Sequence, residues 1–193
     1  ALAAVAVAVA CGGTVEQAAA ALADAAPVSA HRMAVHTRSD GVTVIDDAYN
    51  ANPDSMRAAL KALVTMARAG DTPRRTFAVL GEMGELGEES VVEHDRIGRL
   101  AVRLDVTRIV AVGATRPVRG LFQGAVMEGS WGEEAGHVPD ADAAIALLEN
   151  ELEPGDIVLV KASQSVGLWS VADALLGAGT ANTDGAVDTE AAR

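Results

Sequence analysis

The sequence predicts an α/β fold in which a mostly parallel sheet carries helices on both faces. The hydrophobic runs within residues 75–81, 108–113 and 156–163 are continuous rather than alternating, which is typical of strands buried on both faces. Segments of about ten to fifteen residues with helical periodicity separate these runs. The chain has 193 residues, half of them hydrophobic, which suffices for one domain with a sizeable core and a fragment of a second.

The chain opens with two predicted helices, residues 1–11 and 15–25. Gly12 and Gly13 end the first, and Thr14 followed three residues later by Gln17 is a capping signature for the second. The opening apolar run has no basic residues before it and is too short to span a bilayer. Because the sequence starts inside an apolar helix and lacks an initiator Met, we expect the chain to be a fragment of a longer protein.

A domain boundary is expected in "DAAPVSAHR", where proline and small polar residues interrupt the helical pattern. We therefore expect three parts. Residues 1–31 end a preceding domain, residues 32–176 form the main domain, and residues 177–193 are a flexible tail with little to bury.

An antiparallel hairpin is expected at the entry to the main domain. The alternating residues 32–38 and the strand-like residues 42–46 are separated by Ser39-Asp40-Gly41, a turn signal. Asn52 followed by Pro53 then predicts the start of a helix, with residues 56–69 in its body.

The remaining predicted elements alternate along the chain. Strands are expected at 75–81, 108–113 and 156–163, and helices from about 90 to 104 and at 118–126, 140–152 and 166–177. The segment 127–139 is assigned neither helix nor strand.

Composition excludes several classes of function. The net charge of −12, without a basic stripe, argues against a nucleic-acid partner. The single cysteine, Cys11, excludes a disulfide framework and a cysteine zinc cluster, and it fits a reducing, cytoplasmic compartment. No His, Asp or Glu spacing marks a zinc site, so no metal ligands are expected in this chain. No membrane association is expected either.

Four loops follow predicted strands and should open on one edge of the sheet, where α/β proteins bind ligands. They are Asp46–Asn52, Gly81–Glu89, Gly113–Pro117 and Lys161–Ser165. Their shared placement is a stronger signal than any one of the loops alone.

The Asp46–Asn52 loop is the strongest candidate site. Asp46 and Asp47 at a strand end could bind a metal, accept hydrogen bonds from ribose hydroxyls or act as a base. A solvated helix-capping turn would explain Asn52 but not the rest of the loop. Tyr49, the only tyrosine in the chain, is suited to stacking or hydrogen bonding. We favour a functional loop.

Two further loops carry contrasting signals. The glycines of Gly81–Glu89 fit neither a Walker A loop nor a dinucleotide fingerprint, so a flexible acidic loop is the preferred interpretation. In "LVKASQS", Lys161 is followed by Ser163 and Ser165, which together could seat a carboxylate or phosphate. We favour that function over the alternative, a structural salt bridge of the lysine.

The basic pair His31-Arg32 lies at the expected domain junction. Arg32 could reach a phosphate held by a neighbouring domain, although a plain linker charge is the alternative. Among the other histidines, His36 and His137 are expected at the surface, and His94 is expected to make local hydrogen bonds.

Three motifs resemble the C-terminal domain of the Mur ligases. They are "DDAYNANPDSMRAAL", "AVLGEMGELGEES" and "VLVKASQS", and the resemblance runs from residue 1 to about residue 176. It implies a Rossmann-like domain preceded by the last helices of a central ATPase domain. Within the family, the motifs are most similar to the ligases that add D-alanyl-D-alanine to UDP-N-acetylmuramoyl-tripeptide. The resemblance also implies ATP as a substrate, an acyl phosphate intermediate, and Mg²⁺ held by the absent central domain.

The resemblance also implies roles for individual residues. Arg32 corresponds to a catalytic arginine that contacts the ATP γ-phosphate, although His31 stands where many relatives have glycine. The resemblance places ATP contacts at Asp47 and Tyr49, acceptor-side contacts at Asn50, Asn52 and Ser55, and contacts near the incoming D-alanyl-D-alanine at Lys161, Ser163 and Ser165. In the last loop, Ala162 and Gln164 replace the usual glycine and arginine.

Two alternatives remain. One is a non-catalytic nucleotide-binding or protein-interaction domain. The other is a different Mur ligase or a folylpolyglutamate-type ligase, against which "YNANP" argues. The chain contains no G-x-x-x-x-G-K-[ST] loop. We therefore expect the isolated chain to be inactive and to need the N-terminal and central domains of the same protein as partners.

Overall fold

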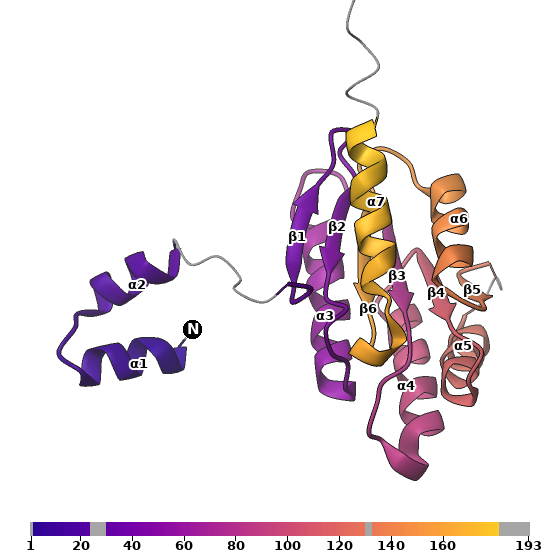
Figure 1. Ribbon diagram of the computed structural model, residues 1–193, viewed down its shortest axis with the longest axis horizontal. Helices are drawn as coiled ribbons and strands as arrows, with labels where there is room; N and C mark the ends of the chain where they lie inside the picture. Colours follow the sequence, from indigo (N-terminus) through magenta and orange to yellow (C-terminus); the bar gives the residue numbers. More distant parts are fainter. Residues whose placement is uncertain (1, 24–29, 130–132, 182–193) are drawn as a thin grey trace, which may run out of the picture. The chain divides into compact units, whose positions relative to one another are not determined.

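The computed structural model describes residues 2–23, 30–129 and 133–181 (Figure 1). The chain divides into two compact units, residues 1–30 and 31–193. None of the helices in the described ranges is both long and apolar enough to cross a membrane.

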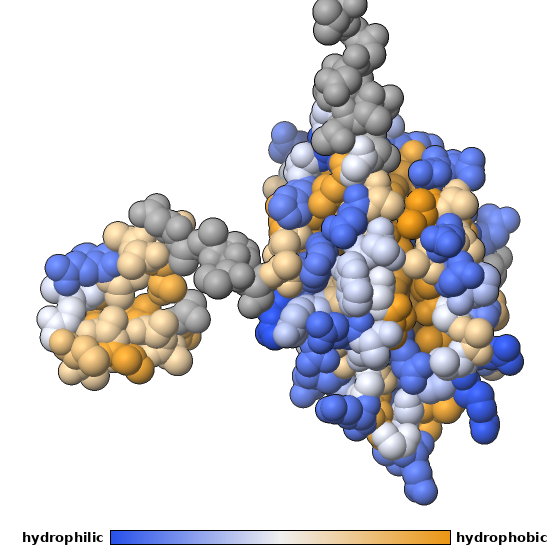
Figure 2. All heavy atoms as spheres, in the orientation of Figure 1, coloured by the Kyte–Doolittle hydropathy of each residue, from blue (hydrophilic) through white to orange (hydrophobic). Residues whose placement is uncertain are grey.

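Unit 1 contains two short helices, α1 (Leu2–Ala10) and α2 (Val15–Ala23). The predicted cap is present, because the Thr14 N–H donates to Gln17 Oε1 at 3.0 Å and the Gln17 N–H donates to Thr14 Oγ1 at 3.2 Å. Neither helix buries a residue, and much of the surface of the two helices is hydrophobic (Figure 2). The expected end of the second helix, at residue 25, lies outside the described residues.

Unit 2 is built on a six-stranded sheet in the order β1-β2-β6-β3-β4-β5. Only β1 is antiparallel to its neighbour, β2, which confirms the predicted hairpin, and the other four pairings are parallel. The strand bounds are β1 Ala34–Thr37, β2 Thr43–Asp46, β3 Thr76–Leu80, β4 Arg108–Val112, β5 Ala135–Val138 and β6 Ile157–Lys161.

Helices cover both faces of this sheet, as predicted (Figure 1). One face carries α3 (Pro53–Ala67), α4 (Ser90–Arg103) and α5 (Arg116–Glu128), and the other carries α6 (Ala141–Glu151) and α7 (Trp169–Ala181). Short 3₁₀ helices at Gly87–Glu89 and Gln164–Val166 precede α4 and α7.

Alternate residues of each central strand enter two separate cores. Ile45 and Leu159 pack under α3 to α5, whereas Val44 and Val158 pack under α6 and α7. Because successive strand residues point to opposite faces, both residue sets must be apolar. This double burial is the physical reason for the continuous apolar runs in the sequence.

Glycines allow α4 and α5 to pack closely side by side. A Cβ added at Gly124 would lie 2.2 Å from the Asp95 carbonyl oxygen, and one at Gly98 would lie 2.0 Å from the Leu121 carbonyl oxygen. The loops after β3 and β4 lead into these two helices, whose close packing holds the helices side by side.

Two features differ from the sequence-based expectation. Strand β5 was not predicted, because its residues AGHV form a partly buried edge strand without a β-branched or apolar run. Helix α7 continues to Ala181, so residues 177–181 of the expected tail are helical, and the rest of that tail lies outside the described residues. The predicted start of α3 at Pro53, directly after the Asn52 cap, is confirmed.

Candidate functional site

The candidate site lies at the carboxyl end of the parallel strands, on both sides of β6. The chain leaves β2 toward α3 on one face of the sheet, leaves β6 toward α7 on the other face, and leaves β3 toward α4 on the first face again. Divergence of adjacent connections opens a crevice, which is where open α/β sheets bind ligands. Three hollows that described residues line lie along this edge of the sheet.

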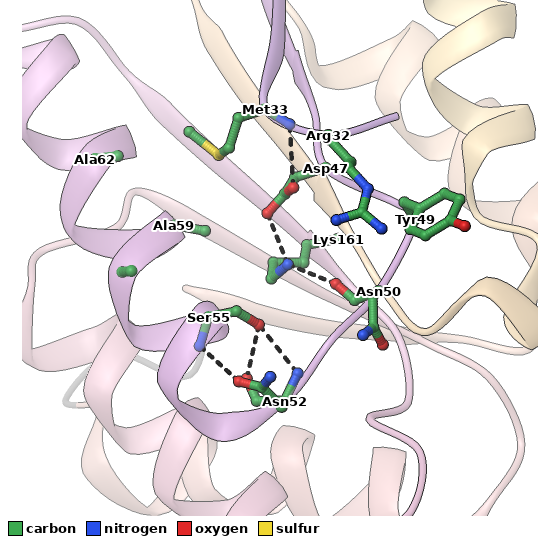
Figure 3. Close-up of a pocket in the computed structure, with 11 residues that line it drawn as sticks. Arg32, Met33, Asp47, Tyr49, Asn50, Asn52, Ser55, Ala59, Ala62 and Lys161 are labelled. Carbon is green, nitrogen blue, oxygen red and sulfur yellow. Dashed lines mark hydrogen bonds and ion pairs between the residues drawn. The ribbon is translucent and has the colours of Figure 1, made fainter. Parts of the chain in front are cut away.

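The first hollow has a volume of about 490 Å³ and lies between the turn after β2 and helix α3 (Figure 3). Its polar lining contains seven of the nine predicted site residues, Arg32, Asp47, Tyr49, Asn50, Asn52, Ser55 and Lys161. Its apolar wall comes from Met33 and three alanines of α3, which the sequence analysis did not identify. The hollow therefore combines charged groups with a flat apolar wall.

Lys161 and Asp47 form a buried ion pair at the base of this hollow. The Lys161 ammonium donates to Asp47 Oδ2 at 2.6 Å and to the Asn50 carbonyl at 2.7 Å, and the lysine side chain is only 1% exposed. The alternative considered for this lysine, a structural salt bridge, is thus formed. In this conformation Lys161 fixes the Asp47 carboxylate and the turn that follows it.

Arg32 is exposed, and its guanidinium lies over the ring of Tyr49. The guanidinium carbon is 4.1 Å from the ring centroid, a distance typical of a cation–π contact. Both side chains line the first hollow (Figure 3). The contact holds the charge at the edge of the hollow, where an anionic group could reach it.

Asn52 and Ser55 form the capping box of α3. The Ser55 N–H donates to Asn52 Oδ1 at 2.8 Å, and the Asn52 N–H donates to Ser55 Oγ at 3.0 Å. The predicted cap at Asn52 is confirmed, and the side-chain oxygens of both residues serve the start of the helix. A role for these two side chains toward a substrate stays a prediction.

The second hollow, of about 480 Å³, shares Tyr49, Asn50 and Asn52 with the first and adds Ser163 and Ser165. All nine predicted site residues therefore lie along one continuous edge. The strand-end geometry inferred from the sequence is confirmed, whereas the ligand that each residue contacts stays a prediction.

The third hollow, of about 310 Å³, extends this edge toward β4. It brings Glu82, Gly113 and Thr115 next to Ser163 and Ser165. The four loops expected to open together thus line adjoining hollows. Neither Glu82 nor Thr115 was predicted individually as a site residue, because neither lies in a distinctive motif.

Hydrogen bonds anchor the glycine-containing loop after β3, which the sequence analysis treated as a flexible acidic segment. The Gly84 N–H donates to Ser163 Oγ at 2.6 Å, and the Ser163 N–H donates to the Glu82 carbonyl at 2.9 Å. His94, fully buried, accepts from the Met83 N–H at 2.8 Å. This loop and the loop after β6 are therefore built as one unit.

His94 makes the local hydrogen bonds that were predicted for it. Its Nδ1–H donates to the Ser90 carbonyl at 2.6 Å, and its Nε2 accepts from the Met83 backbone, which defines a neutral tautomer. Burial lowers the pKa of His94, because the charged form loses its hydration.

His31 lies beside the first hollow and pairs with Asp46. His31 Nδ1 is 2.6 Å from Asp46 Oδ2, and an oxygen of Asp173 from α7 belongs to the same cluster, within 4.8 Å. Two ligands of one tetrahedral zinc ion lie about 3.3 Å apart. The 2.6 Å separation is therefore that of a hydrogen-bonded pair rather than of two ligands sharing an ion.

The comparison with protein families matches residues 31–164 to "Mur ligase, glutamate ligase domain". The chain belongs to the Mur ligase family. This match covers unit 2 from its first residue through the loop after β6, so it includes eight of the nine predicted site residues and ends just before Ser165.

Curated Mur ligases are similar over nearly the whole chain. The UDP-N-acetylmuramoyl-tripeptide–D-alanyl-D-alanine ligase of Mycobacterium tuberculosis is 60% identical over 187 residues, which cover 91% of this chain and 37% of that protein. The enzyme of the same name from Escherichia coli is 31% identical over 182 residues, covering 93% of this chain and 37% of that protein. The chain thus spans little more than a third of the length of these relatives.

Crystal structures of Mur ligases share the fold. MurF from Thermotoga maritima in complex with ADP has a TM-score of 0.73 at 24% identity, covering 92% of this chain and 37% of that one. MurF from Acinetobacter baumannii has a TM-score of 0.73 at 27% identity, covering 88% of this chain and 35% of that one. The predicted α/β class and its mostly parallel sheet are confirmed.

Proposed function

We propose that this chain is the C-terminal part of an ATP-dependent ligase that joins D-alanyl-D-alanine to UDP-N-acetylmuramoyl-tripeptide. The observation that carries the proposal is the gathering of Arg32, the Asp47–Lys161 pair and Ser163 on one edge of the sheet, beside adjoining hollows. The similarity to relatives of that name over 91% of the chain supports the same reaction.

The proposed reaction forms an amide in two steps. The terminal carboxylate of the tripeptide attacks the γ-phosphorus of ATP, which yields an acyl phosphate and ADP. The amine of the dipeptide then attacks the acyl carbon, and the tetrahedral intermediate expels inorganic phosphate while the nitrogen loses a proton. Positioning and stabilisation of phosphoryl charge account for most of the rate of such reactions.

Arg32 and the first hollow are suited to ATP. A guanidinium at the edge of the hollow can donate two parallel hydrogen bonds to phosphate oxygens. The Asp47 carboxylate, oriented by Lys161, can accept from ribose hydroxyls, and the alanine wall of α3 offers a flat surface for a base. Tyr49 is the aromatic group beside these contacts. Mg²⁺, when bound by the preceding central domain, would neutralise charge on the phosphates.

The second and third hollows are suited to the acceptor. The hydroxyls of Ser163 and Ser165 line both of them, and Glu82 supplies a carboxylate that could receive the ammonium of a zwitterionic dipeptide. Asn50 and Asn52 separate this region from the first hollow. In this proposal the acceptor amine approaches the acyl phosphate across those two residues.

Unit 1 fits the proposal as the end of the preceding ATPase domain. Its two helices bury no residue and Leu2 is 88% exposed, so the described residues of unit 1 form no core of their own. We infer that the missing central domain covers the two helices. Because the phosphate-binding loop would also lie in that domain, the isolated chain should not catalyse ligation. Consumption of ATP and a nucleotide-linked precursor argues for a cytoplasmic location.

A ligation assay on the longer protein tests this function. The protein is incubated with ATP, Mg²⁺ and UDP-N-acetylmuramoyl-tripeptide, and each of three acceptors is supplied in turn: D-alanyl-D-alanine, D-alanine and glutamate. Mass spectrometry should show the pentapeptide product and equimolar phosphate with the dipeptide alone. Glutamate addition to a folate, supplied in a parallel reaction in place of the precursor, would favour a folylpolyglutamate-type ligase, and ATP binding without product from either donor would favour a non-catalytic nucleotide-binding domain.

A further inference from the structure

Arg32 stands between two residues with unusual backbone conformations. His31 has φ of 59° and Met33 has φ of 48°, and they are two of the four non-glycine residues with positive φ in the described part of the chain. Residues other than glycine adopt this region rarely and persist there when their surroundings fix them. The direction of Arg32 is therefore set by what holds its two neighbours.

Both neighbours are bonded to the turn that follows β2. The Tyr49 N–H donates to the His31 carbonyl at 3.0 Å, and the Met33 N–H donates to Asp47 Oδ1 at 3.1 Å. The same turn supplies the Tyr49 ring under the Arg32 guanidinium. The turn after β2 therefore contacts the residues before and after Arg32 as well as the Arg32 guanidinium.

The His31 ring adds a third attachment, to β2 and α7. Its Nδ1–H donates to Asp46 Oδ2 at 2.6 Å, and the Asp46 carboxylate is buried and also accepts from the Ala48 N–H at 3.3 Å. The ring centroid lies 6.1 Å from that of Trp169, and the Asp173 carboxylate is nearby on α7. A glycine at position 31 would permit the same φ but would provide none of these contacts.

We propose that His31 is a positioning residue for Arg32. The hydrogen bond from His31 to Asp46 fixes the left-handed turn that lays the Arg32 guanidinium on Tyr49 at the edge of the first hollow. A guanidinium held in place loses less rotational freedom when it binds an anion, so its contact with phosphate is strengthened. The benefit to ATP rests on the proposed function, whereas the positioning of Arg32 does not.

The positioning is tested without any reaction, in the 193-residue chain. The ring current of Tyr49 should displace the NMR signal of the Arg32 Nε–H group from that of an exposed arginine. His31→Gly keeps the backbone conformation available and removes the ring, so the displacement should largely disappear. Asp46→Asn, which leaves the ring but weakens its hydrogen bond, should reduce it too. His36→Asn, at an exposed histidine of β1, is the control and should leave it intact. Urea unfolding verifies that each variant is folded.

Steady-state kinetics of the longer protein test the consequence. His31→Gly should raise KM for ATP by about tenfold and leave KM for the dipeptide unchanged. His36→Asn should leave both unchanged. An Arg32 signal that stays displaced in both His31→Gly and Asp46→Asn overturns the proposal, whether or not the protein is a ligase. A signal that moves while KM for ATP does not would support the positioning and overturn the assignment of Arg32 to ATP.

Discussion

Removal of the Asp47 carboxylate should destabilise unit 2 far more than removal of a surface carboxylate. The Lys161 side chain is 1% exposed, and its ammonium donates hydrogen bonds to Asp47 and to the Asn50 carbonyl. Asp47→Ala removes the first of these acceptors and leaves the second. Breaking a buried pair by removal of one member costs about 3–5 kcal/mol, because the other charge stays buried without compensation. The Met33 N–H loses its acceptor as well.

Urea unfolding of the 193-residue chain, followed by circular dichroism, measures this loss. The matched control is Glu153→Ala, which removes a carboxylate that is 69% exposed from its ion pair with Arg75. Such surface pairs contribute at most about 1 kcal/mol. Lys161→Met combined with Asp47→Ala should recover much of the loss, since no buried charge is then left unpaired.

A loss of stability in Asp47→Ala no greater than that in Glu153→Ala would contradict this prediction. So would a double variant that is less stable than Asp47→Ala alone. Either result would mean that water or another group reaches the Lys161 ammonium, so that the ion pair does not organise the base of the first hollow.

Three further predictions concern the packing of the helices, the buried histidine and the arginine. Gly124→Ala should lower the free energy of unfolding, measured by thermal melts, by about 1–3 kcal/mol or more, because the new Cβ would lie 2.2 Å from the Asp95 carbonyl oxygen. Gly70→Ala is the control and should have little effect, since the nearest atom to its Cβ is 4.0 Å away. Burial lowers the pKa of His94, so as the pH falls the unfolded state takes up this proton before the folded state does. The contribution of His94 to stability should be constant above about pH 6.5 and fall by up to about 1.4 kcal/mol per pH unit below it. His94→Gln should remove that part of the slope in urea unfolding at several pH values, and an unchanged slope would contradict the assignment. In the longer protein, Arg32→Ala should reduce kcat/KM for ATP by about 100-fold or more. The unfolding midpoint should change little, since the Arg32 side chain is exposed. A decrease in kcat/KM for the dipeptide alone would contradict the role of Arg32 toward ATP.

Local patterns predicted local structure well in this chain. Capping signatures at Thr14 and Asn52 were confirmed as hydrogen-bonded caps, since the interacting atoms lie three residues apart. Continuous apolar runs correctly identified β3, β4 and β6. Strand β5 was missed because an edge strand needs fewer apolar residues than a central one.

The site could be predicted only as a gathering of loops, and not in its internal contacts. Asp47 and Lys161 are 114 residues apart, and they meet because β2 and β6 are adjacent in the sheet. Strand order depends on how the helices pack, and no local motif encodes it. His31 and Asp46 meet across the predicted hairpin, but the sequence carries no local sign of the positive φ at His31 that accompanies this pairing.

Titration of ATP into the 193-residue chain, followed by amide NMR, would show whether the edge formed by Arg32, Asp47 and Tyr49 is a nucleotide-binding surface. Saturable shifts should appear at these residues and be absent at Gly70, which lies after α3 and away from the site. If ATP produces no shift at Asp47 and Tyr49 at any concentration reached, the claim that this edge binds a nucleotide is contradicted.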